Sequence, residues 1–311
     1  MLYYKADNEN FSIPDYYISD YENVIIEYED EFMKLTPNDS LLLRGGVQMN
    51  LPFENFVLSN KSNLDSTKDV FKFKRRHTPY FELNKYQFKP NITKSEAFKN
   101  ENQYKMFKQM HHTWFNLLKE EFDKSYFNDI LKTLYLIREN KGSIRPDKED
   151  YFKQFLQPLE DTKVIFINNE YYENNVPFLE GITPVSTYFK EEILKASKFK
   201  RKESLTLNQL NNIGVLGLNA SPTSSLLKKN QYFELWKPFF NRVIEHLENY
   251  FLNPVVFVLV GKQVLYYEQN IRKHQVITIE HPSKSIKETG EWNGQQLFKQ
   301  INNILNEEIR W

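Results

Sequence analysis

The stretch that decides the fold of this chain is Val164-Ile165-Phe166-Ile167-Asn168-Asn169-Glu170-Tyr171-Tyr172. Its first four residues are apolar and rich in β-formers, which predicts a buried strand. The residues that follow are polar, acidic and aromatic, so we expect this strand to open into a loop that carries functional side chains. Open α/β sheets place their ligands at the carboxyl ends of the strands.

Three further apolar runs, at 214–219, 255–260 and 276–280, have the length and composition of buried strands. Helical periodicity separates them: the pattern predicts helices at about 187–197, 233–251 and 295–307, and two more between 114 and 137 lead into the first strand. Strands that alternate with helices favour a parallel arrangement. The sequence therefore predicts an α/β fold with a central parallel four-stranded sheet flanked by helices.

Residues 1–110 differ from the rest of the chain, because short apolar runs such as Val24-Ile25-Ile26 are separated by proline and glycine. This predicts an N-terminal extension of mixed or β-rich structure before a second domain at 111–311. Ten acidic side chains against two lysines fall in 1–39, and ten basic against three acidic in 72–108. Such opposite charge segments are typical of a surface that docks DNA or a protein partner, although a solvated surface strand explains the basic segment as well.

The composition excludes several classes of protein. The 41 basic and 41 acidic residues balance, there is no cysteine, and no apolar run reaches membrane-spanning length. No glycine-rich phosphate loop or metal-spaced histidine cluster is present, so we expect no cofactor and no metal. A soluble intracellular protein of the cytoplasm or nucleus, without membrane contact, is the expectation.

Polar residues follow three of the predicted strands: Asn169 and Glu170, then Asn219, then His281. Each has an ordinary explanation by itself, as a turn former, a cap or a solvated carboxylate. In a parallel sheet, however, the carboxyl ends share one edge, so these side chains are expected to converge. A carboxylate, an amide and an imidazole together indicate a pocket.

These side-chain types suit the removal of a base from a sugar. An amide offers a donor and an acceptor, which is the pattern needed to read the edge of an imide-like base such as uracil. An imidazole can stabilise negative charge on the departing base, and a carboxylate can orient water and stabilise an oxocarbenium-like sugar. Tyr172 and Phe178 could wall and stack the base.

The order of motifs over about 110–311 resembles the uracil-DNA glycosylase family, of the single-domain family 1 type that removes uracil from DNA. The segments that carry this resemblance are Trp114 with Glu120-Glu121-Phe122, Ile144-Arg145-Pro146, Lys163-Val164-Ile165-Phe166-Ile167, Gly214-Val215-Leu216-Gly217-Leu218-Asn219-Ala220, Val258-Leu259-Val260-Gly261, His281-Pro282-Ser283 and Arg310-Trp311. Each segment is weak by itself, and their shared order and spacing is a strong signal of homology.

The resemblance implies a role for each matching residue. Asn219 would read uracil, and His281 would stabilise the uracil oxyanion. Tyr172 would exclude the thymine methyl group, and Phe178 would stack on the base in a Val-Pro-Phe setting similar to that of poxvirus members. Other matching positions would complete the uracil pocket or contact DNA: Asn169 for uracil, and Lys262, Ser283, Lys284, Ser285 and Ile286 for DNA.

The chain departs from the family in two loops. The family's water-activating GQDPYHG is Asn168-Asn169-Glu170-Tyr171-Tyr172-Glu173-Asn174 here, so glutamate replaces aspartate. Its longer side chain shifts the carboxylate by about 1 Å, which in a preorganised site can cost on the order of 100-fold in rate. The family's HPSPLS wedge has Ser285 at the wedge position, and only Ile286 could substitute for it.

Two hypotheses follow. The first, which we favour because the carboxylate, amide and imidazole survive, is a divergent glycosylase that hydrolyses the uracil–deoxyribose bond with reduced efficiency, using Glu170 and His281. The second is an inactive glycosylase-fold protein that binds uracil-bearing or single-stranded DNA within a replication or transcription complex. A hydrolase of another class would leave the ordered motifs unexplained.

Overall fold

The computed structural model describes residues 1–6, 10–14, 23–36, 80–140, 142–170, 207–225, 227–228, 230–282, 295–306 and 309. The chain forms two compact units, Met1–Lys105 and Met106–Trp311. The boundary between them falls inside helix α5 (Glu101–Gln109), which the apolar pattern did not predict.

The first unit contains a three-stranded mixed sheet, in agreement with the β-rich expectation. Its strands are β1 (Leu2–Lys5), β3 (Val24–Tyr28) and β4 (Glu31–Leu35), in the order β1-β3-β4. β1 runs parallel to β3, and β3 pairs with β4 in an antiparallel hairpin. Glu29 and Asp30 form the tight turn of this hairpin with φ of 50° and 65°. β2 (Asn10–Pro14) and β5 (Tyr80–Asn84) form a separate antiparallel pair, and η4 (Lys85–Gln87) and α4 (Lys94–Ala97) follow.

The outer edge of β4 is covered by the segment around Asn91. The Asn91 side chain accepts a hydrogen bond from the Lys34 backbone N–H at 2.7 Å and donates one to the Lys34 carbonyl at 3.0 Å. Its amide therefore pairs with Lys34 as the backbone of a neighbouring strand would. Beneath this edge, Val24, Ile26, Met33, Leu35 and Phe88 form the apolar cluster of the first unit.

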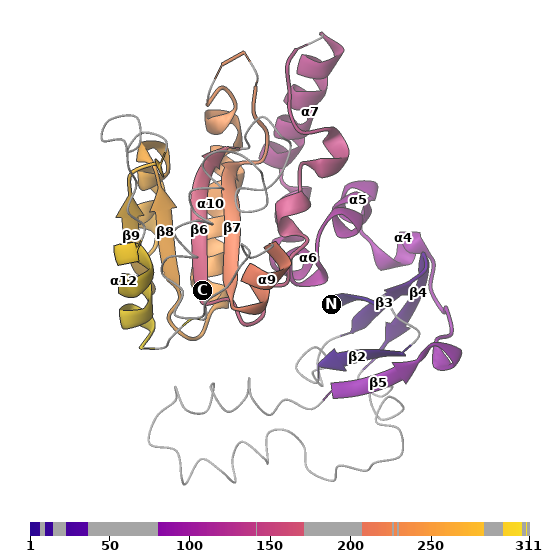
Figure 1. Ribbon diagram of the computed structural model, residues 1–311. Coiled ribbons are helices and arrows are strands. Elements are labelled where there is room, and N and C mark those ends of the chain that lie inside the picture. Colours follow the sequence, from indigo (N-terminus) through magenta and orange to yellow (C-terminus); the bar gives the residue numbers. More distant parts are fainter. Residues whose placement is uncertain are drawn as a thin grey trace. The chain divides into compact units, whose positions relative to one another are not determined.

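The second unit contains the four-stranded parallel sheet that the sequence predicted (Figure 1). Its strands are β6 (Val164–Glu170), β7 (Val215–Ser221), β8 (Val256–Val260) and β9 (Gln275–Ile279), in the order β7-β6-β8-β9. All three pairings are parallel. β6 continues three residues beyond Ile167, because Asn168 and Glu170 pair with β7. The polar residues expected in a loop therefore belong to the strand itself.

Helices precede, separate and follow these strands. The described ones are α6 (His112–Leu118), α7 (Ser125–Glu139), α9 (Leu207–Asn212), α10 (Phe233–Tyr250) and α12 (Gln295–Leu305), with 3-10 turns η5 (Glu121–Asp123), η6 (Lys148–Asp150), η7 (Lys153–Phe155) and η8 (Lys262–Asn270). The helix expected at 187–197 lies outside the described residues. No helix in the described ranges has both the length and the apolar character needed to span a bilayer.

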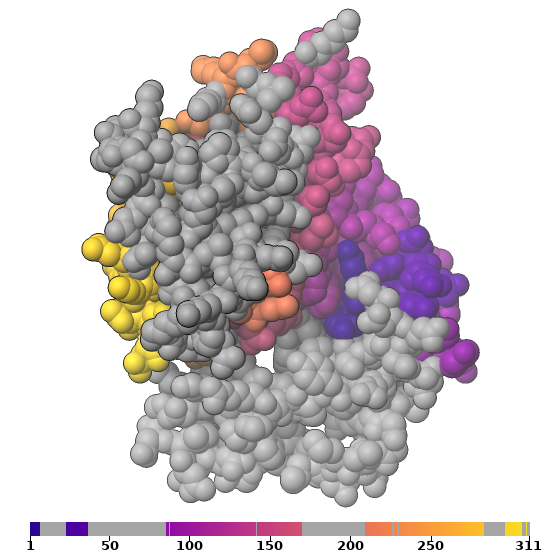
Figure 2. All heavy atoms as spheres, in the orientation of Figure 1, coloured from indigo at the N-terminus to yellow at the C-terminus, as the bar shows by residue number. Residues whose placement is uncertain are grey.

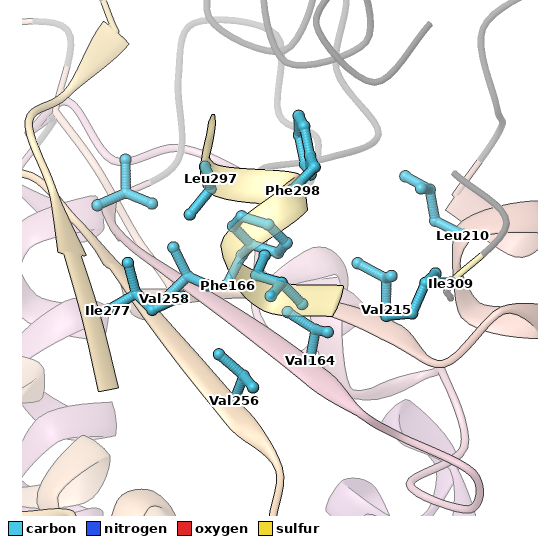
Figure 3. Packing of buried hydrophobic residues seen from close by; sticks show 12 residues of the cluster. Val164, Phe166, Leu210, Val215, Val256, Val258, Ile277, Leu297, Phe298 and Ile309 are labelled. Atoms are coloured by element: carbon cyan, nitrogen blue, oxygen red, sulfur yellow. The ribbon is translucent and has the colours of Figure 1, made fainter. Parts of the chain in front are cut away.

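The two faces of the parallel sheet have different cores. On one face, Val164 and Phe166 of β6 pack with Leu297 and Phe298 of α12 in a buried apolar cluster (Figure 3). α12 (yellow) also reaches the molecular surface (Figure 2), where Ile304 is 36% exposed. α10 packs against β7, and its aromatic side chains meet those of η7 and the residues before it. The sheet is thus covered on both faces, which explains the unbroken apolar run of the inner strand β8.

A buried carboxylate ties α10 to η5. The side chain of Glu121 is 3% exposed and accepts hydrogen bonds from Tyr126 (2.7 Å) and Arg242 (3.1 Å), and its Oε1 lies 3.1 Å from His246 Nε2. Burial alone would raise the pKa of Glu121, but these hydrogen bonds outweigh it and hold the pKa below its usual range. The carboxylate is therefore ionised at neutral pH and links two elements far apart in sequence.

Candidate functional site

The strand register places the predicted site residues at one edge of the sheet. A single row of paired residues crosses the four strands through Leu218, Ile167, Leu259 and Thr278. Asn219 lies one position beyond this row, and Glu170, Lys262 and His281 each lie three positions beyond it in their own segments. Residues about 110 apart in sequence thus share the carboxyl edge of the sheet.

Asn219 is fully buried at this edge, with 0% exposure, as are Asn168 and Ser221. Its Oδ1 accepts a hydrogen bond from Asn168 Nδ2 at 3.5 Å, across the pair that β6 and β7 form. Its Nδ2 has no hydrogen-bond partner among the described residues. A buried amide nitrogen is rarely left without an acceptor, so this atom has the character of a ligand-binding group.

The backbone of Asn219 is held by a second buried amide. Gln154 Oε1 accepts a hydrogen bond from Asn219 N–H at 2.7 Å, and Gln154 Nε2 donates one to the Asn219 carbonyl at 3.2 Å. Gln154 itself is 2% exposed and belongs to η7. Immediately after β7, Ser224 and Arg145 exchange two backbone hydrogen bonds of 2.8 and 2.9 Å. The chain segment before β6 therefore closes the outer edge of β7.

Asn169, predicted to bind uracil, is half-buried at the end of β6. Its Nδ2 donates a short hydrogen bond to Oδ1 of Asn230, which lies in the loop after β7. Its Oδ1 has no partner among the described residues. The Asn169 Oδ1 is thus left as an acceptor for anything that enters the site.

His281 is held against a glycine with an unusual backbone. Gly261 has φ 92° and ψ 163°, a region that only glycine adopts readily, and its N–H donates to the Ile279 carbonyl at 2.9 Å. A Cβ built on Gly261 would lie 3.4 Å from His281 Cβ. The ends of β8 and β9 therefore lie side by side, and the exposed Lys262 begins η8 at the same place.

The structure describes only part of the predicted site. The backbone of Glu170 ends β6 opposite Ser221, and its side chain is outside the described part. The remaining predicted residues also lie outside the described residues: Tyr172, Phe178, Ser283, Lys284, Ser285 and Ile286. Within the described ranges, no group of three or more histidine, aspartate or glutamate side chains could hold a metal ion.

Sequence reasoning missed three polar residues of this site: Gln154, Asn168 and Asn230. A glutamine inside the aromatic run Tyr151-Phe152-Lys153-Gln154-Phe155 was a usable signal, because a polar side chain among core aromatics needs a buried partner. Asn168 was visible at the end of the strand, but the strand continues past it, so its side chain faces Asn219. The role of Asn230 depends on how the loop after β7 folds back.

A parallel four-stranded sheet with a buried, ligand-ready amide at its carboxyl edge defines an α/β protein with a polar site at that edge. No family model matches the chain. A curated relative, uracil-DNA glycosylase of Vibrio campbellii, is 31% identical over 219 residues, which cover 64% of this chain and 95% of the relative. The uracil-DNA glycosylase of Streptococcus pneumoniae is 28% identical over 213 residues, 63% of this chain and 94% of that one. The chain belongs to the uracil-DNA glycosylase family.

Solved structures share the fold. Mimivirus uracil-DNA glycosylase superimposes with a TM-score of 0.54 at 18% identity, over 71% of this chain and 93% of that one. A mimivirus UNG variant in complex with UGI also gives a TM-score of 0.54, at 19% identity, over 65% of this chain and 89% of that one.

Proposed function

We propose that this protein binds DNA and hydrolyses the N-glycosidic bond between uracil and deoxyribose. The observation that carries this proposal is the fully buried Asn219, whose Nδ2 has no partner among the described residues at the edge where His281 and the end of β6 also lie. In the reaction, the N1–C1′ bond breaks, the base leaves with the bonding electrons, and water oxygen bonds to C1′ while a proton from that water is released. Membership of the uracil-DNA glycosylase family supports this chemistry.

Asn219 is proposed to read the base. Its Nδ2 can donate to uracil O4, and its Oδ1 retains a second lone pair that can accept from uracil N3–H while the first accepts from Asn168. Cytosine offers an amino donor at the position of O4 and no hydrogen at N3, so it would meet the wrong partner at both atoms. A side-chain amide held in this orientation therefore selects uracil over cytosine.

His281 is proposed to stabilise the negative charge that develops on the departing base. Its Cβ lies beside Gly261 at the end of β8, which keeps the imidazole at the carboxyl edge of the sheet where the charge would form. A preorganised donor of this kind contributes about 3 kcal/mol to transition-state stabilisation in comparable oxyanion sites. His281 thus acts on the base, at the opposite side of the scissile bond from the water.

Glu170 is proposed to orient the attacking water and to stabilise the oxocarbenium-like sugar. Its backbone is placed by pairing with Ser221, at the same edge as Asn219. The extra methylene relative to the family's aspartate changes the reach of the carboxylate, and we propose a rate on the order of 100-fold below that of an ideal site. The enzyme is therefore proposed to be active but slow.

The remaining contacts are proposed for residues whose chemistry suits the base or DNA. Lys262, exposed at the start of η8, would bind a phosphate. Tyr172 and Phe178 would enclose the base, and Ser283, Lys284, Ser285 and Ile286 would contact the duplex or a single strand. Residues 1–110, with their acidic and basic segments, would dock DNA or a protein partner. DNA as substrate places the activity inside the cell.

One experiment tests the proposed function. The protein is incubated with a uracil-containing oligonucleotide, treated with alkali and examined for strand breaks, alongside the Asn219→Asp, Glu170→Gln and Asn211→Asp variants. We expect breaks with the unmodified chain, their loss in the first two variants and their retention in Asn211→Asp, because Asn211 precedes β7 at the opposite edge of the sheet. Tight binding of uracil DNA with no abasic product, at excess protein and long incubation, would instead support the inactive binding protein.

A further inference from the structure

The side chain of Gln154 lies beside the edge strand β7, where no further strand of the described residues pairs with it. β7 is the outermost strand of the sheet, and β6 pairs with only one of its sides. At Asn219, the N–H and C=O that point away from β6 are both taken by the Gln154 side chain, at 2.7 and 3.2 Å. One buried amide thus replaces the missing strand at the residue proposed to read the base.

These two hydrogen bonds fix the direction of the Asn219 side chain. The N–H belongs to the peptide before Asn219 and the C=O to the peptide after it, so holding both restrains the rotation of the backbone on either side of its Cα. The Cα–Cβ direction follows from these rotations. The long hydrogen bond of 3.5 Å from Asn168 Nδ2 to Asn219 Oδ1 then favours the orientation in which the amide oxygen faces Asn168. Backbone and amide are therefore restrained by two different side chains.

The orientation of the Asn219 side-chain amide decides which base it can recognise. With Oδ1 turned toward Asn168, Nδ2 is the atom left to donate, which matches O4 of uracil. An amide free to turn over would offer its oxygen at the same place for part of the time, and would then match the amino group of cytosine.

We propose that Gln154 is a positioning residue that sets the direction of the Asn219 amide and thereby the affinity for uracil. This inference rests on the proposed function, because it assigns a role within the same site. Gln154 does not contact the base; it acts through the backbone of Asn219.

The Gln154→Met variant tests the proposal, because methionine retains the volume of the side chain and removes both hydrogen bonds. We expect kcat/KM for a uracil-containing oligonucleotide to fall about 100-fold. Inhibition by free uracil should weaken by a similar factor, while affinity for the same oligonucleotide without uracil stays unchanged. Gln103→Met is the matched control, since Gln103 is also 2% exposed but belongs to the other compact unit.

The Gln154→Glu variant gives a second readout that general destabilisation cannot imitate. An ionised carboxylate still accepts from Asn219 N–H but repels its carbonyl, whereas a protonated carboxyl group both accepts and donates as the amide does. Burial next to a carbonyl should raise the pKa of the introduced carboxyl group. The activity of this variant relative to the unmodified chain is therefore expected to recover as pH is lowered toward 5.

Three results would contradict this inference. Gln154→Met with unchanged uracil inhibition and unchanged kcat/KM would show that Gln154 positions nothing. Equal losses in Gln154→Met and Gln103→Met, or a loss of affinity for DNA without uracil, would show a general effect on folding. If the unmodified chain neither excises uracil nor is inhibited by it, the proposed function itself fails, and the inference fails with it.

Discussion

Gly261 and His281 lie beside each other at the ends of two neighbouring strands, and a Cβ on the glycine would lie 3.4 Å from the Cβ of the histidine. That distance leaves room for a methyl group, but the backbone of Gly261, at φ 92° and ψ 163°, does not suit an alanine. The conformation rather than the space requires glycine here, and it also sets where Lys262 begins η8.

We therefore expect Gly261→Ala to destabilise the fold by about 1–3 kcal/mol and to lower uracil excision by more than this loss explains. Relief of the backbone strain would move His281 and Lys262 together. The matched control is Gly214→Ala, where φ is 84° and a Cβ would lie 2.6 Å from the Asp161 carbonyl oxygen, at the amino end of β7. Melting temperature and excision rate, measured for both variants, separate a loss of stability from a specific loss of activity. Equal excision rates in the folded Gly261→Ala and Gly214→Ala proteins would contradict the prediction.

Replacement of Glu121 by glutamine should destabilise the protein at neutral pH and have little effect in acid. The folded-state pKa of Glu121 lies below its ordinary value of 4.5, so its stabilisation is present above that value and is lost as pH falls through the folded pKa. Glu121 is buried but its partner Arg242 is 39% exposed, so the loss of these charged hydrogen bonds is expected to cost about 2 kcal/mol at pH 7. Denaturant unfolding of both proteins from pH 7 to 3 measures the difference.

The control for this variant is Glu245→Gln, which removes the other carboxylate that contacts Arg242. Glu245 is 56% exposed, so its ion pair should contribute about 0–1 kcal/mol. A difference between the Glu121→Gln and unmodified proteins that does not narrow in acid would show that the Glu121 carboxylate is not the group responsible.

We expect His274 to make the stability of the protein depend on pH over a higher pH range than Glu121 does. Burial lowers the pKa of His274 below its ordinary value of 6.5, and the facing Glu248 only partly offsets this. The unfolded chain therefore takes up a proton first, so stability is lost as pH falls below about 6.5 toward the folded pKa. His274→Gln should flatten the dependence of melting temperature on pH between about 7 and 5. An identical slope in the variant would contradict the assignment.

Lys262→Ala should weaken binding to DNA without changing its preference for uracil. A lysine that contacts one phosphate contributes about one to the slope of log affinity against log salt concentration. Titrations from 50 to 200 mM salt should thus show a shallower slope in the variant. Lys299→Ala, an exposed lysine on α12, is the control and should leave the slope unchanged. A loss of affinity with an unaltered slope would exclude the phosphate contact.

Asn91→Leu should loosen β4 without affecting the parallel sheet. It removes two hydrogen bonds to the backbone of Lys34, which together contribute about 1–2 kcal/mol. Hydrogen exchange resolved by residue should show faster exchange at the Lys34 amide. The backbone N–H of Asn219, which donates a hydrogen bond to Gln154, should exchange at its original rate.

The parallel sheet could be predicted because the sequence pattern of each strand and each helix lies within a single short segment. Apolar runs in the strands alternate along the chain with helical repeats, as where Phe233–Tyr250 precedes Val256–Val260. The same reasoning missed α5, whose sequence ENQYKMFKQ has too few apolar residues for a clear stripe. It also ended β6 too early, because pairing with β7 rather than apolar character extends that strand to Glu170.

The candidate site could be predicted only where residue type and strand position coincide. Asn219 and His281 follow apolar runs, so their shared edge was visible in the sequence. Gln154 lies 65 residues from Asn219, and its pairing depends on how the segment before β6 crosses the sheet edge. A contact of that kind leaves no periodic pattern to detect. The identity of the glutamine beside aromatic residues was the one local sign of it.

The side-chain amides of Asn91 and Gln154 have a consequence for how this protein behaves at high concentration. Each occupies the N–H and the C=O of one residue on an outermost strand, β4 in one sheet and β7 in the other. Unoccupied groups on such strands are a template for a second chain, and intermolecular β-sheet growth starts there. At these two residues the template is already filled. We therefore expect the glutamine proposed to orient a base-reading amide also to hinder the pairing of a second chain with β7 at Asn219.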